Sequence, residues 1–276
     1  LMVNRYFLSR ENGFILSCYS WIPDSFNSII IIVHGIGEHA LRYGHVAEEL
    51  NRAGSAVFSF DLRGHGSSAG KRGHIVSYEA VISDIDAVAE MANKTLGSHP
   101  LFIYGHSMGG GIVLSKRMFF HGKEAGYIVT SPWVELVNPP SPLLFLLAKA
   151  LSWLLPSFTM PSGLIADLIS TDKDVVKSYR EDPLVHDRVS ANTGVDGIEY
   201  GRLLLSSRTQ PSAPLFLAHG KEDGIVKVEA SRKLASRGDG NVTYLELPGY
   251  HELHNEPSCF RQLMDGIEVF IRNNAR

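Results

Sequence analysis

Gly105-His106-Ser107-Met108-Gly109 matches the pattern Gly-x-Ser-x-Gly and stands between two segments of different character. The apolar run from Leu101 to Tyr104 comes directly before it and is typical of a buried strand, while the residues after Gly109 are typical of a helix start. A serine on such a sharp strand-to-helix turn has an exposed hydroxyl, and the next backbone N–H lies near a reacting carbonyl. The stretch predicts a nucleophilic Ser107. The alternative is an ordinary glycine-rich turn with an inert serine.

Short apolar runs alternate with helical patterns along most of the chain. Continuous apolar strands are typical of a parallel sheet that helices cover on both faces. The alternation predicts an α/β fold with a doubly wound, mostly parallel sheet, whose sites gather at the carboxyl ends of the strands. The predicted strands are 13–20, 29–33, 56–60, 101–104, 127–130, 215–218 and 242–247, and the predicted helices are 45–53, 78–95, 109–120, 226–236 and 260–272.

The alternation of strands and helices stops between about residues 132 and 208. This stretch contains prolines, a long apolar run and polar helix-like segments, but no clean succession of strand and helix. An insertion of this kind between two late strands indicates a cap over the site. We therefore predict a first core part over 1–131, a helical cap (lid) over 132–208 and a second core part over 209–276.

The insertion contains the apolar run from Leu143 to Leu155, which only Lys149 and Ser152 interrupt. A helix needs about 20 residues to span a bilayer, and this run is shorter, so we do not expect it to cross a membrane. It predicts either a buried cap helix or a helix that shapes an acyl-chain tunnel and contacts a membrane or micelle surface. The residues expected to bind the acyl chain are Leu143, Leu146, Leu147 and Leu151.

A serine hydroxyl is a weak nucleophile near neutral pH, so it needs a base and a group that orients the base. On this kind of sheet the acid follows the serine along the chain and the histidine comes last. Asp223 follows the penultimate predicted strand, with Glu222 as the neighbouring alternative. His251 comes first in the loop after the last predicted strand, and His254 competes with it. We predict that Asp223 orients His251, which takes the proton from Ser107.

Two backbone donors are needed to form an oxyanion hole. One is the N–H of Met108, directly after the nucleophile. The other is expected in the loop after an early predicted strand, His34-Gly35-Ile36-Gly37-Glu38-His39, whose small residues let the backbone approach a carbonyl. We predict the N–H of Ile36 as this donor. Each such donor stabilises a transition state by about 2.7–4 kcal/mol.

Composition excludes several classes of partner. The 276-residue chain has a formal net charge of −3 and no basic run, so we expect no nucleic acid. Cys18 and Cys259 lie far apart and fit no metal spacing, which favours two free buried thiols in a reducing compartment over a disulfide. We expect no metal and no cofactor. Leu1 to Arg5 have no secretory signal pattern, so we expect a cytoplasmic protein, peripheral to a membrane where its cap contacts one.

Several motifs together resemble a known family. The stretch from His34 to His39, followed by Arg42-Tyr43, resembles the His-Gly-x-Gly-Glu-His signature of the monoacylglycerol lipases and lysophospholipases. The resemblance implies an α/β-hydrolase fold with a helical cap, no cofactor, Ser107, Asp223 and His251 as the triad, and Ile36 and Met108 as oxyanion donors. The other matching motifs follow in the family's order over almost the whole chain: Phe60 to Ser68 with Gly70 and Arg72-Gly73, Gly105 to Gly110, Asp182 to Val185, His219-Gly220 with Asp223, and His251-Glu252.

The motifs predict a serine ester hydrolase that cleaves fatty-acyl monoesters, above all monoacylglycerol, through an acyl-enzyme on Ser107. The alternatives are a lysophospholipase, a broad carboxylesterase and, in another class, a non-catalytic ligand-binding protein on the same fold. A peptidase is disfavoured by the apolar cap. The expected partner is a small lipid ester. The acyl length, the head group and the oligomeric state are not predicted, because 157–174 and 194–200 contain no motif.

Overall fold

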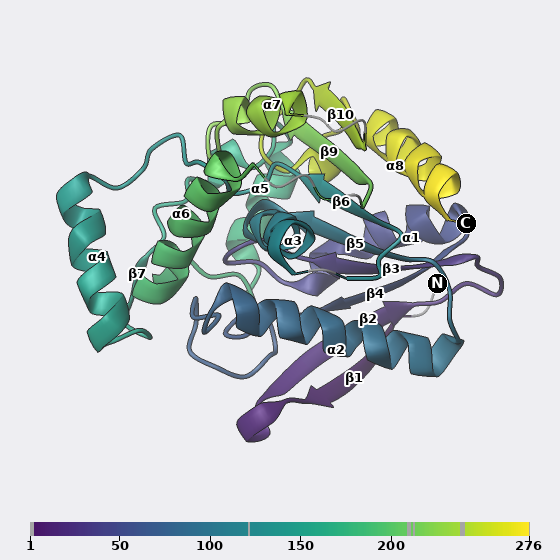
Figure 1. Cartoon of the computed structure of the whole chain (residues 1–276), viewed down its shortest axis with the longest axis horizontal. Coiled ribbons are helices and arrows are strands. Elements are labelled where there is room, and N and C mark those ends of the chain that lie inside the picture. Colours follow the sequence, from purple (N-terminus) through teal and green to yellow (C-terminus); the bar gives the residue numbers. More distant parts are fainter. Residues whose placement is uncertain (1–2, 121, 209–210, 212, 238–240, 276) are drawn as a thin grey trace.

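An eight-stranded sheet with helices on both faces forms the centre of the computed structural model, which describes residues 3–120, 122–208, 211, 213–237 and 241–275 (Figure 1). The order across the sheet is β1-β2-β4-β3-β5-β6-β9-β10. The strands are β1 (Asn4–Ser9), β2 (Ile15–Trp21), β3 (Ser28–Val33), β4 (Ser55–Phe60), β5 (Leu101–His106), β6 (Gly126–Thr130), β9 (Leu215–Gly220) and β10 (Val242–Leu247).

Every pairing from β4 to β10 is parallel, while β1 pairs with β2 and β2 with β4 in antiparallel fashion. The predicted doubly wound, mostly parallel sheet is therefore confirmed. Strand β1 has no counterpart among the predicted strands. It lies at the sheet edge and its side chains are exposed or half-buried, so its residues lack the apolar run that marks a buried strand.

Two hydrophobic cores cover the two faces of the sheet. Ile29, Ile31 and Val33 of β3 pack into the core that contains α2 (Tyr78–Leu96), α3 (Ser107–Phe119) and α7 (Val228–Ser236). Ile30 and Ile32 of the same strand pack into the core that contains α1 (Gly44–Arg52) and α8 (Phe260–Asn274). Alternate side chains of one strand therefore hold helices on opposite faces, which makes the central strands rigid supports for the loops at their ends.

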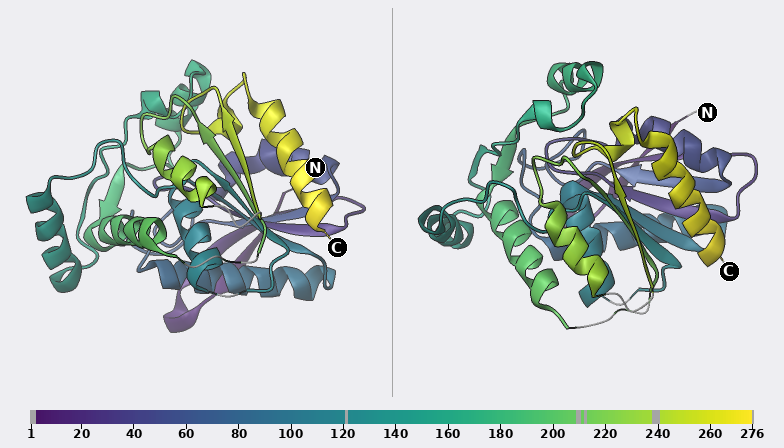
Figure 2. Two further views of the ribbon diagram at one scale, coloured as in Figure 1. Left: turned by 45° about the horizontal axis from the view of Figure 1, so that its top comes forward. Right: turned by 90° about the horizontal axis from the view of Figure 1, so that it is seen from above.

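The chain leaves the sheet after β6 and returns to it at β9, and the stretch between these strands includes residues 132–208, the insertion that the sequence predicts. Its elements are α4 (Pro142–Leu154), β7 (Thr159–Pro161), α5 (Lys173–Glu181), β8 (Arg188–Ser190) and α6 (Ala191–Ser206). Helix α4 lies at the outer edge of the molecule in every view and packs mainly on α6 (Figure 1, Figure 2). Lys149 of α4 pairs with Glu199 of α6 at 2.5 Å.

The expectation that α4 is a buried helix is wrong. None of its residues is buried, and only one face is half-buried, at Phe145, Ala148, Leu151 and Ser152. These residues recur at helical spacing, as expected for a helix with one neighbour. The cause lies in the path of the chain. Pro139 and Pro140 precede the helix and Pro142 begins it, and the helix has α6, rather than the core, beside it.

Two glycines of α6 test how this helix packs. A Cβ at Gly201 would lie 2.0 Å from the carbonyl oxygen of Val134, whereas the nearest atom to a Cβ at Gly194 is 3.8 Å away. We expect Gly201→Ala to lower the free energy of unfolding by about 1–3 kcal/mol through overpacking. The matched variant, Gly194→Ala, should raise it by about 0.5–1 kcal/mol because alanine favours a helix. Urea denaturation measures both; equal effects would contradict the close packing at Gly201.

Candidate active site

Ser107 lies at the sharp turn between β5 and α3. Its φ of +53° is in the left-handed region, which residues other than glycine rarely adopt. The two flanking glycines are required by close backbone packing: a Cβ at Gly105 would lie 2.5 Å from the Gly109 carbonyl oxygen, and one at Gly109 would lie 2.2 Å from that of Val33. The helix therefore starts against the strand ends, and its first residue is the serine.

The structure brings together the three side chains that the sequence pairs. The Ser107 hydroxyl lies 2.8 Å from His251 Nε2, and His251 Nδ1 lies 2.7 Å from Asp223 Oδ2. Asp223 follows β9 and His251 follows β10, so adjacent parallel strands present them at one edge of the sheet. In this arrangement the Ser107 O–H donates to His251, and His251 donates to Asp223.

Both competing residues are engaged elsewhere. Glu222 accepts the Gly249 N–H at 2.6 Å and thereby holds the loop before His251. The His254 ring is buried and stacks on Tyr43, with 4.7 Å between ring centroids. Among the described residues, Glu222 has no hydrogen bond to His251 and His254 has none to Ser107, so the geometry favours Asp223 and His251.

Asp223 is built to remain charged. Its Oδ1 accepts the backbone N–H groups of Ile225 at 2.8 Å and Val226 at 3.0 Å, and Oδ2 also lies 3.2 Å from His219 Nε2. Burial alone would raise the pKa of Asp223, but His251 and His219 lower it well below its usual range. A carboxylate that stays ionised can stabilise the imidazolium that forms when His251 takes a proton.

The two predicted oxyanion donors lie beside the nucleophile. Ile36 and Ser107 line the same pocket, and a Cβ at Gly35 would lie 3.0 Å from the Ser107 Cβ. The Gly35 N–H donates to Glu38 Oε1 at 2.6 Å, which holds the start of the loop. Met108 is in the first turn of α3, where backbone N–H groups lack partners within the helix and attract negative charge.

A buried charge network joins the Ile36 loop to the His251 loop. Arg42 donates two hydrogen bonds of 2.7 Å to the Glu252 carboxylate and one of 2.6 Å to Glu38 Oε2. Burial alone would raise the pKa of Glu252, but Arg42 lowers it to about 2. Burial raises the pKa of Glu38, and Arg42 opposes this rise. The motifs predict no role for these residues, although the positions of Glu38 and Glu252, close to Ile36 and His251 along the chain, were a signal that could have indicated one.

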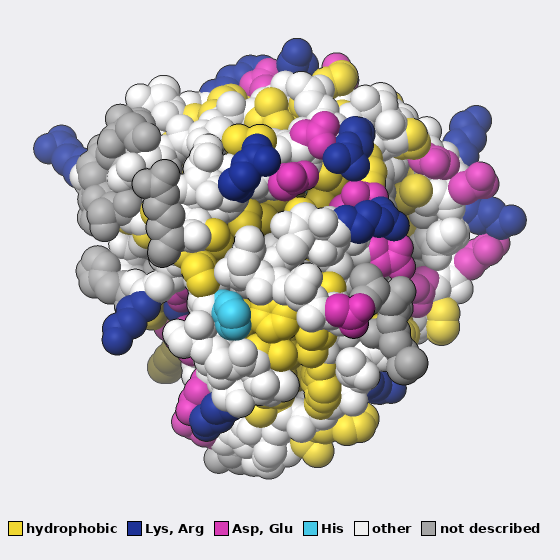
Figure 3. Space-filling view, turned by 90° about the vertical axis from the view of Figure 1, so that its right-hand side faces the viewer, with side chains coloured by type: hydrophobic (Ala, Val, Ile, Leu, Met, Phe, Trp, Pro, Cys, Tyr) yellow, Lys and Arg dark blue, Asp and Glu magenta, His cyan; other side chains and the backbone are white. Residues whose placement is uncertain are grey.

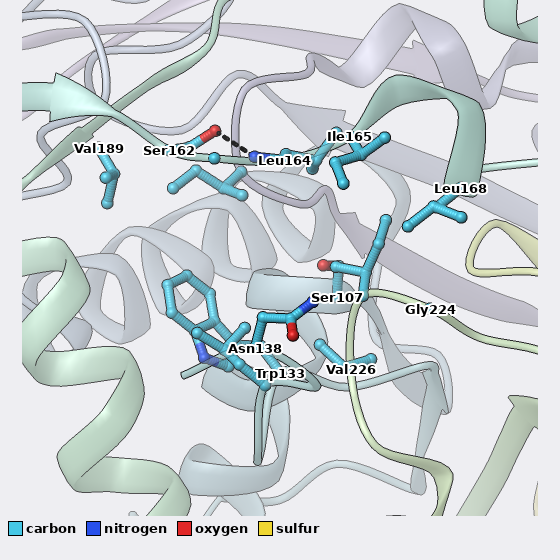
Figure 4. Close-up of a pocket in the computed structure, with 14 residues that line it drawn as sticks. Ser107, Trp133, Asn138, Ser162, Leu164, Ile165, Leu168, Val189, Gly224 and Val226 are labelled. Carbon is cyan, nitrogen blue, oxygen red and sulfur yellow. Dashed lines mark hydrogen bonds between the residues drawn. The ribbon is translucent and has the colours of Figure 1, made fainter. Parts of the chain in front are cut away.

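An apolar pocket opens beside Ser107. Its volume is about 110 Å³. Figure 4 shows Ser107 between Leu164, Ile165 and Leu168 on one side and Trp133, Asn138 and Val226 on the other. The remaining lining residues are Ile36, Leu136, Ser162, Gly163, Val189, Gly224 and Ile225. Much of the pocket therefore comes from 133–138 and 162–168, and the second segment lies wholly within 157–174, where the sequence shows no motif.

The four leucines predicted to bind the acyl chain do not line this pocket. Leu143, Leu146 and Leu147 are 68%, 64% and 53% exposed, and Leu151 is half-buried on the face of α4 that packs on α6. Their assignment to an acyl tunnel needs correction. The physical reason is that α4 lies at the outer edge of the insertion, while the chain after it turns back and places Leu164 and Leu168 over Ser107.

Comparison with known proteins agrees with this geometry. Residues 24–258 match the family model described as serine aminopeptidase, S33. A monoacylglycerol lipase from Mycolicibacterium smegmatis is 35% identical over 91% of this chain and 90% of that protein. The crystal structure of a monoacylglycerol lipase from Paleococcus ferrophilus has a TM-score of 0.84 and 31% identity, over 99% of this chain and 100% of that one.

The chain belongs to the α/β-hydrolase family of the monoacylglycerol lipases. The similar proteins include one named for another activity: the phospholipase YtpA from Bacillus subtilis is 30% identical over 87% of this chain and 93% of that protein. The predicted resemblance is thus confirmed, and the protein is a serine hydrolase. In the described part of the chain, no helix is long and apolar enough to cross a membrane.

As the predicted general base, His251 should set the acid limb of activity through its pKa, because only the neutral ring can accept the Ser107 proton. Burial alone would lower this pKa, but Asp223 raises it, and the balance lies above 6.5. We therefore expect kcat/KM for a soluble ester to fall as the pH drops through a midpoint above 6.5. Initial rates from about pH 5 to about pH 9 measure the midpoint.

Substitution of Asp223 by Asn should reduce kcat by roughly 10⁴-fold. The matched variant Glu222→Gln should retain most of the parent kcat. A larger loss of kcat in Glu222→Gln than in Asp223→Asn would identify Glu222 as the acid.

Proposed function

We propose that this protein hydrolyses fatty-acyl monoesters, with monoacylglycerol as its main substrate, and releases glycerol and a fatty acid. The observation that carries the proposal is the 2.8 Å hydrogen bond between Ser107 Oγ and His251 Nε2 at the wall of an apolar pocket. The names of two relatives, both monoacylglycerol lipases, support the substrate class.

The first half of the reaction forms an acyl-enzyme. Ser107 Oγ attacks the ester carbonyl carbon while His251 takes the hydroxyl proton, and Asp223 stabilises the imidazolium. The negative charge that develops on the carbonyl oxygen is bound by the backbone N–H groups of Ile36 and Met108. The carbon–oxygen bond to glycerol then breaks, and glycerol leaves with the proton from His251.

The second half releases the fatty acid. His251 takes a proton from a water molecule, and the resulting hydroxide attacks the acyl carbon attached to Ser107. The same two backbone donors bind the second oxyanion. When this intermediate collapses, Ser107 recovers its proton from His251 and the fatty acid departs. One ester and one water therefore give one alcohol and one acid.

We further propose that 132–208 acts as a cap over a core made of 1–131 and 209–276. Trp133, Leu136, Leu164 and Leu168 would contact the acyl chain, since these apolar side chains lie in the wall beside Ser107. Each methylene group that enters such a pocket contributes about 0.8 kcal/mol to binding.

We propose the cytoplasm as the location of the protein. Cys18 and Cys259 are buried free thiols, which suits a reducing compartment.

The rival functions make different demands on the same pocket. A lysophospholipase is the principal alternative, and the similarity to a phospholipase supports it; a broad carboxylesterase would have less preference for the acyl chain. An aminopeptidase needs an acid for the substrate's amine, and no Asp or Glu is among the described residues that line the pocket. A non-catalytic receptor would have no need of the bonded Ser107, His251 and Asp223.

Replacement of the nucleophile tests the proposed function. Ser107→Ala should reduce the release of glycerol from a monoacylglycerol by on the order of a millionfold, as in other triads. Rates on monoacylglycerol, lysophosphatidylcholine and an aminoacyl nitroanilide, measured side by side, separate the rival substrates. Labelling by a fluorophosphonate probe is the control, and it should occur on Ser107 of the folded parent protein. Hydrolysis of a short nitrophenyl ester by Ser107→Ala at the parent rate would exclude Ser107 as the nucleophile.

We also propose that α4 is the part of the protein that contacts the lipid surface where the substrate resides. Trp153 is 85% exposed, and Leu143 and Leu146 are 68% and 64% exposed, while Lys149 is the only charged residue of the helix. Trp and Leu side chains on one helix favour the interface between water and lipid. The opposite end of the molecule, which Figure 3 shows, carries hydrophobic side chains interspersed with Lys, Arg, Asp and Glu side chains.

Charge placed on α4 should separate lipid binding from chemistry. We expect the double variant Leu146→Glu and Trp153→Glu to bind phosphatidylcholine vesicles at least about tenfold more weakly, since each buried side chain contributes about 1.5–3 kcal/mol. Hydrolysis of vesicle-bound monoacylglycerol should fall in parallel, while that of a soluble short ester should be unchanged. Val269→Glu on α8 is the control, because Val269 is 45% exposed on a distant helix. Unchanged sedimentation of the double variant with vesicles would refute this docking surface.

A further inference from the structure

The oxyanion loop is held from the side of the insertion as well as from the core. The backbone N–H of His186 donates to the Gly37 carbonyl at 2.8 Å. The two segments approach so closely that a Cβ at Gly37, whose φ is +77°, would lie 2.4 Å from the His186 carbonyl oxygen. This contact is made by the residue directly after Ile36, so the position of the insertion is coupled to the orientation of the Ile36 peptide.

Asp182 adds a side-chain contact to the end of the same loop. This residue ends α5, and its Oδ2 accepts a hydrogen bond of 2.9 Å from His39 Nε2, whose side chain is 5% exposed. Its Oδ1 accepts the Leu184 N–H at 2.8 Å, which shapes the turn that leads to His186. Burial alone would raise the pKa of Asp182, but the bonds from His39 and Leu184 keep it below 3.8.

The contacts that His186 and Asp182 make with the loop at 34–39 add to the hydrogen bond between Glu38 and Gly35 within that loop. Glu38 holds the Gly35 N–H before Ile36, and His186 holds the Gly37 carbonyl after it. The His186 ring is itself anchored to the core, where Nε2 donates to the Gly64 carbonyl at 3.2 Å. An oxyanion donor must lie within about 2.7–3.1 Å of the developing charge, so small displacements of this loop reduce catalysis.

We propose that Asp182 is a positioning residue for the oxyanion hole: through His39, and through the turn that presents the His186 N–H to Gly37, it orients the N–H of Ile36. This inference rests on the proposed role of Ile36. It gives a function to the Asp182 to Val185 motif, which neither the triad nor the pocket uses.

The test separates transition-state binding from folding. We expect Asp182→Ala to lower kcat on a soluble nitrophenyl ester about tenfold with little change in KM, because complete loss of a donor costs about 10²–10³ in kcat. Affinity for an alkyl trifluoromethyl ketone, which forms a tetrahedral oxyanion on serine, should fall by the same factor. The matched control is Asp172→Ala, since Asp172 caps the other end of α5 through the Asp174 N–H at 2.8 Å. It should lower the melting temperature and leave kcat and ketone affinity unchanged.

Removal of the contact from its other side provides a second variant. His39→Ala should reproduce the loss of kcat and of ketone affinity, and the double variant with Asp182→Ala should be no worse than the poorer single variant. If Asp182→Ala does not fold, His39→Ala alone decides the matter. Parental kcat and ketone affinity in a folded variant of either residue would overturn the proposal. An inactive parent protein would instead contradict the proposed hydrolase function.

Discussion

The close approach of α3 to the end of β3 is the constraint on which the site depends. No side chain fits at Gly109, where a Cβ would meet the carbonyl oxygens of Val33 and His34 at 2.2 and 2.5 Å. The helix must therefore begin directly beside the strand, and Ser107 takes a positive φ that costs about 1–3 kcal/mol. Because His34 also begins the loop that contains Ile36, the same contact sets the separation of Ser107 from this loop, the proposed source of an oxyanion donor. The two buried faces of the sheet supply the rigidity that maintains this strain.

The charge network around Arg42 extends this constraint to the loop of His251, the proposed general base. Each ion taken out of water costs several kcal/mol unless it is paired and hydrogen-bonded, so Arg42, Glu38 and Glu252 are stable only as a complete set. Apolar residues of the same volume could be equally stable there. They would lack the directed bonds by which Glu38 holds Gly35 and Arg42 holds the residue next to His251. The network therefore relates two loops that no shared strand connects.

These features explain which parts of the protein could be predicted from its sequence. The buried strands and the order of Ser107, Asp223 and His251 follow from local patterns, because parallel strands present successive loops at one edge. The surroundings of α4 do not follow from local patterns. An apolar helix can be exposed, and only the path of the chain decides whether it is buried. Contacts such as Asp182 with His39, separated by 143 positions, leave no spacing pattern. The edge strand β1 was missed because half-exposed residues lack an apolar run.

The insertion combines two parts with different physical roles. Its inner part is bonded to both catalytic loops: the His186 N–H donates to Gly37, and the Glu252 N–H donates to Ile169 at 2.7 Å. Movement of this part would break backbone hydrogen bonds next to Ile36 and His251, so it belongs structurally to the candidate site. The outer helix α4 has one main neighbour and exposed apolar residues, so the lipid contact proposed for it would leave those bonds intact. The proposed lipid contact and the proposed chemistry therefore belong to different parts of the insertion, and a change in one part need not alter the other.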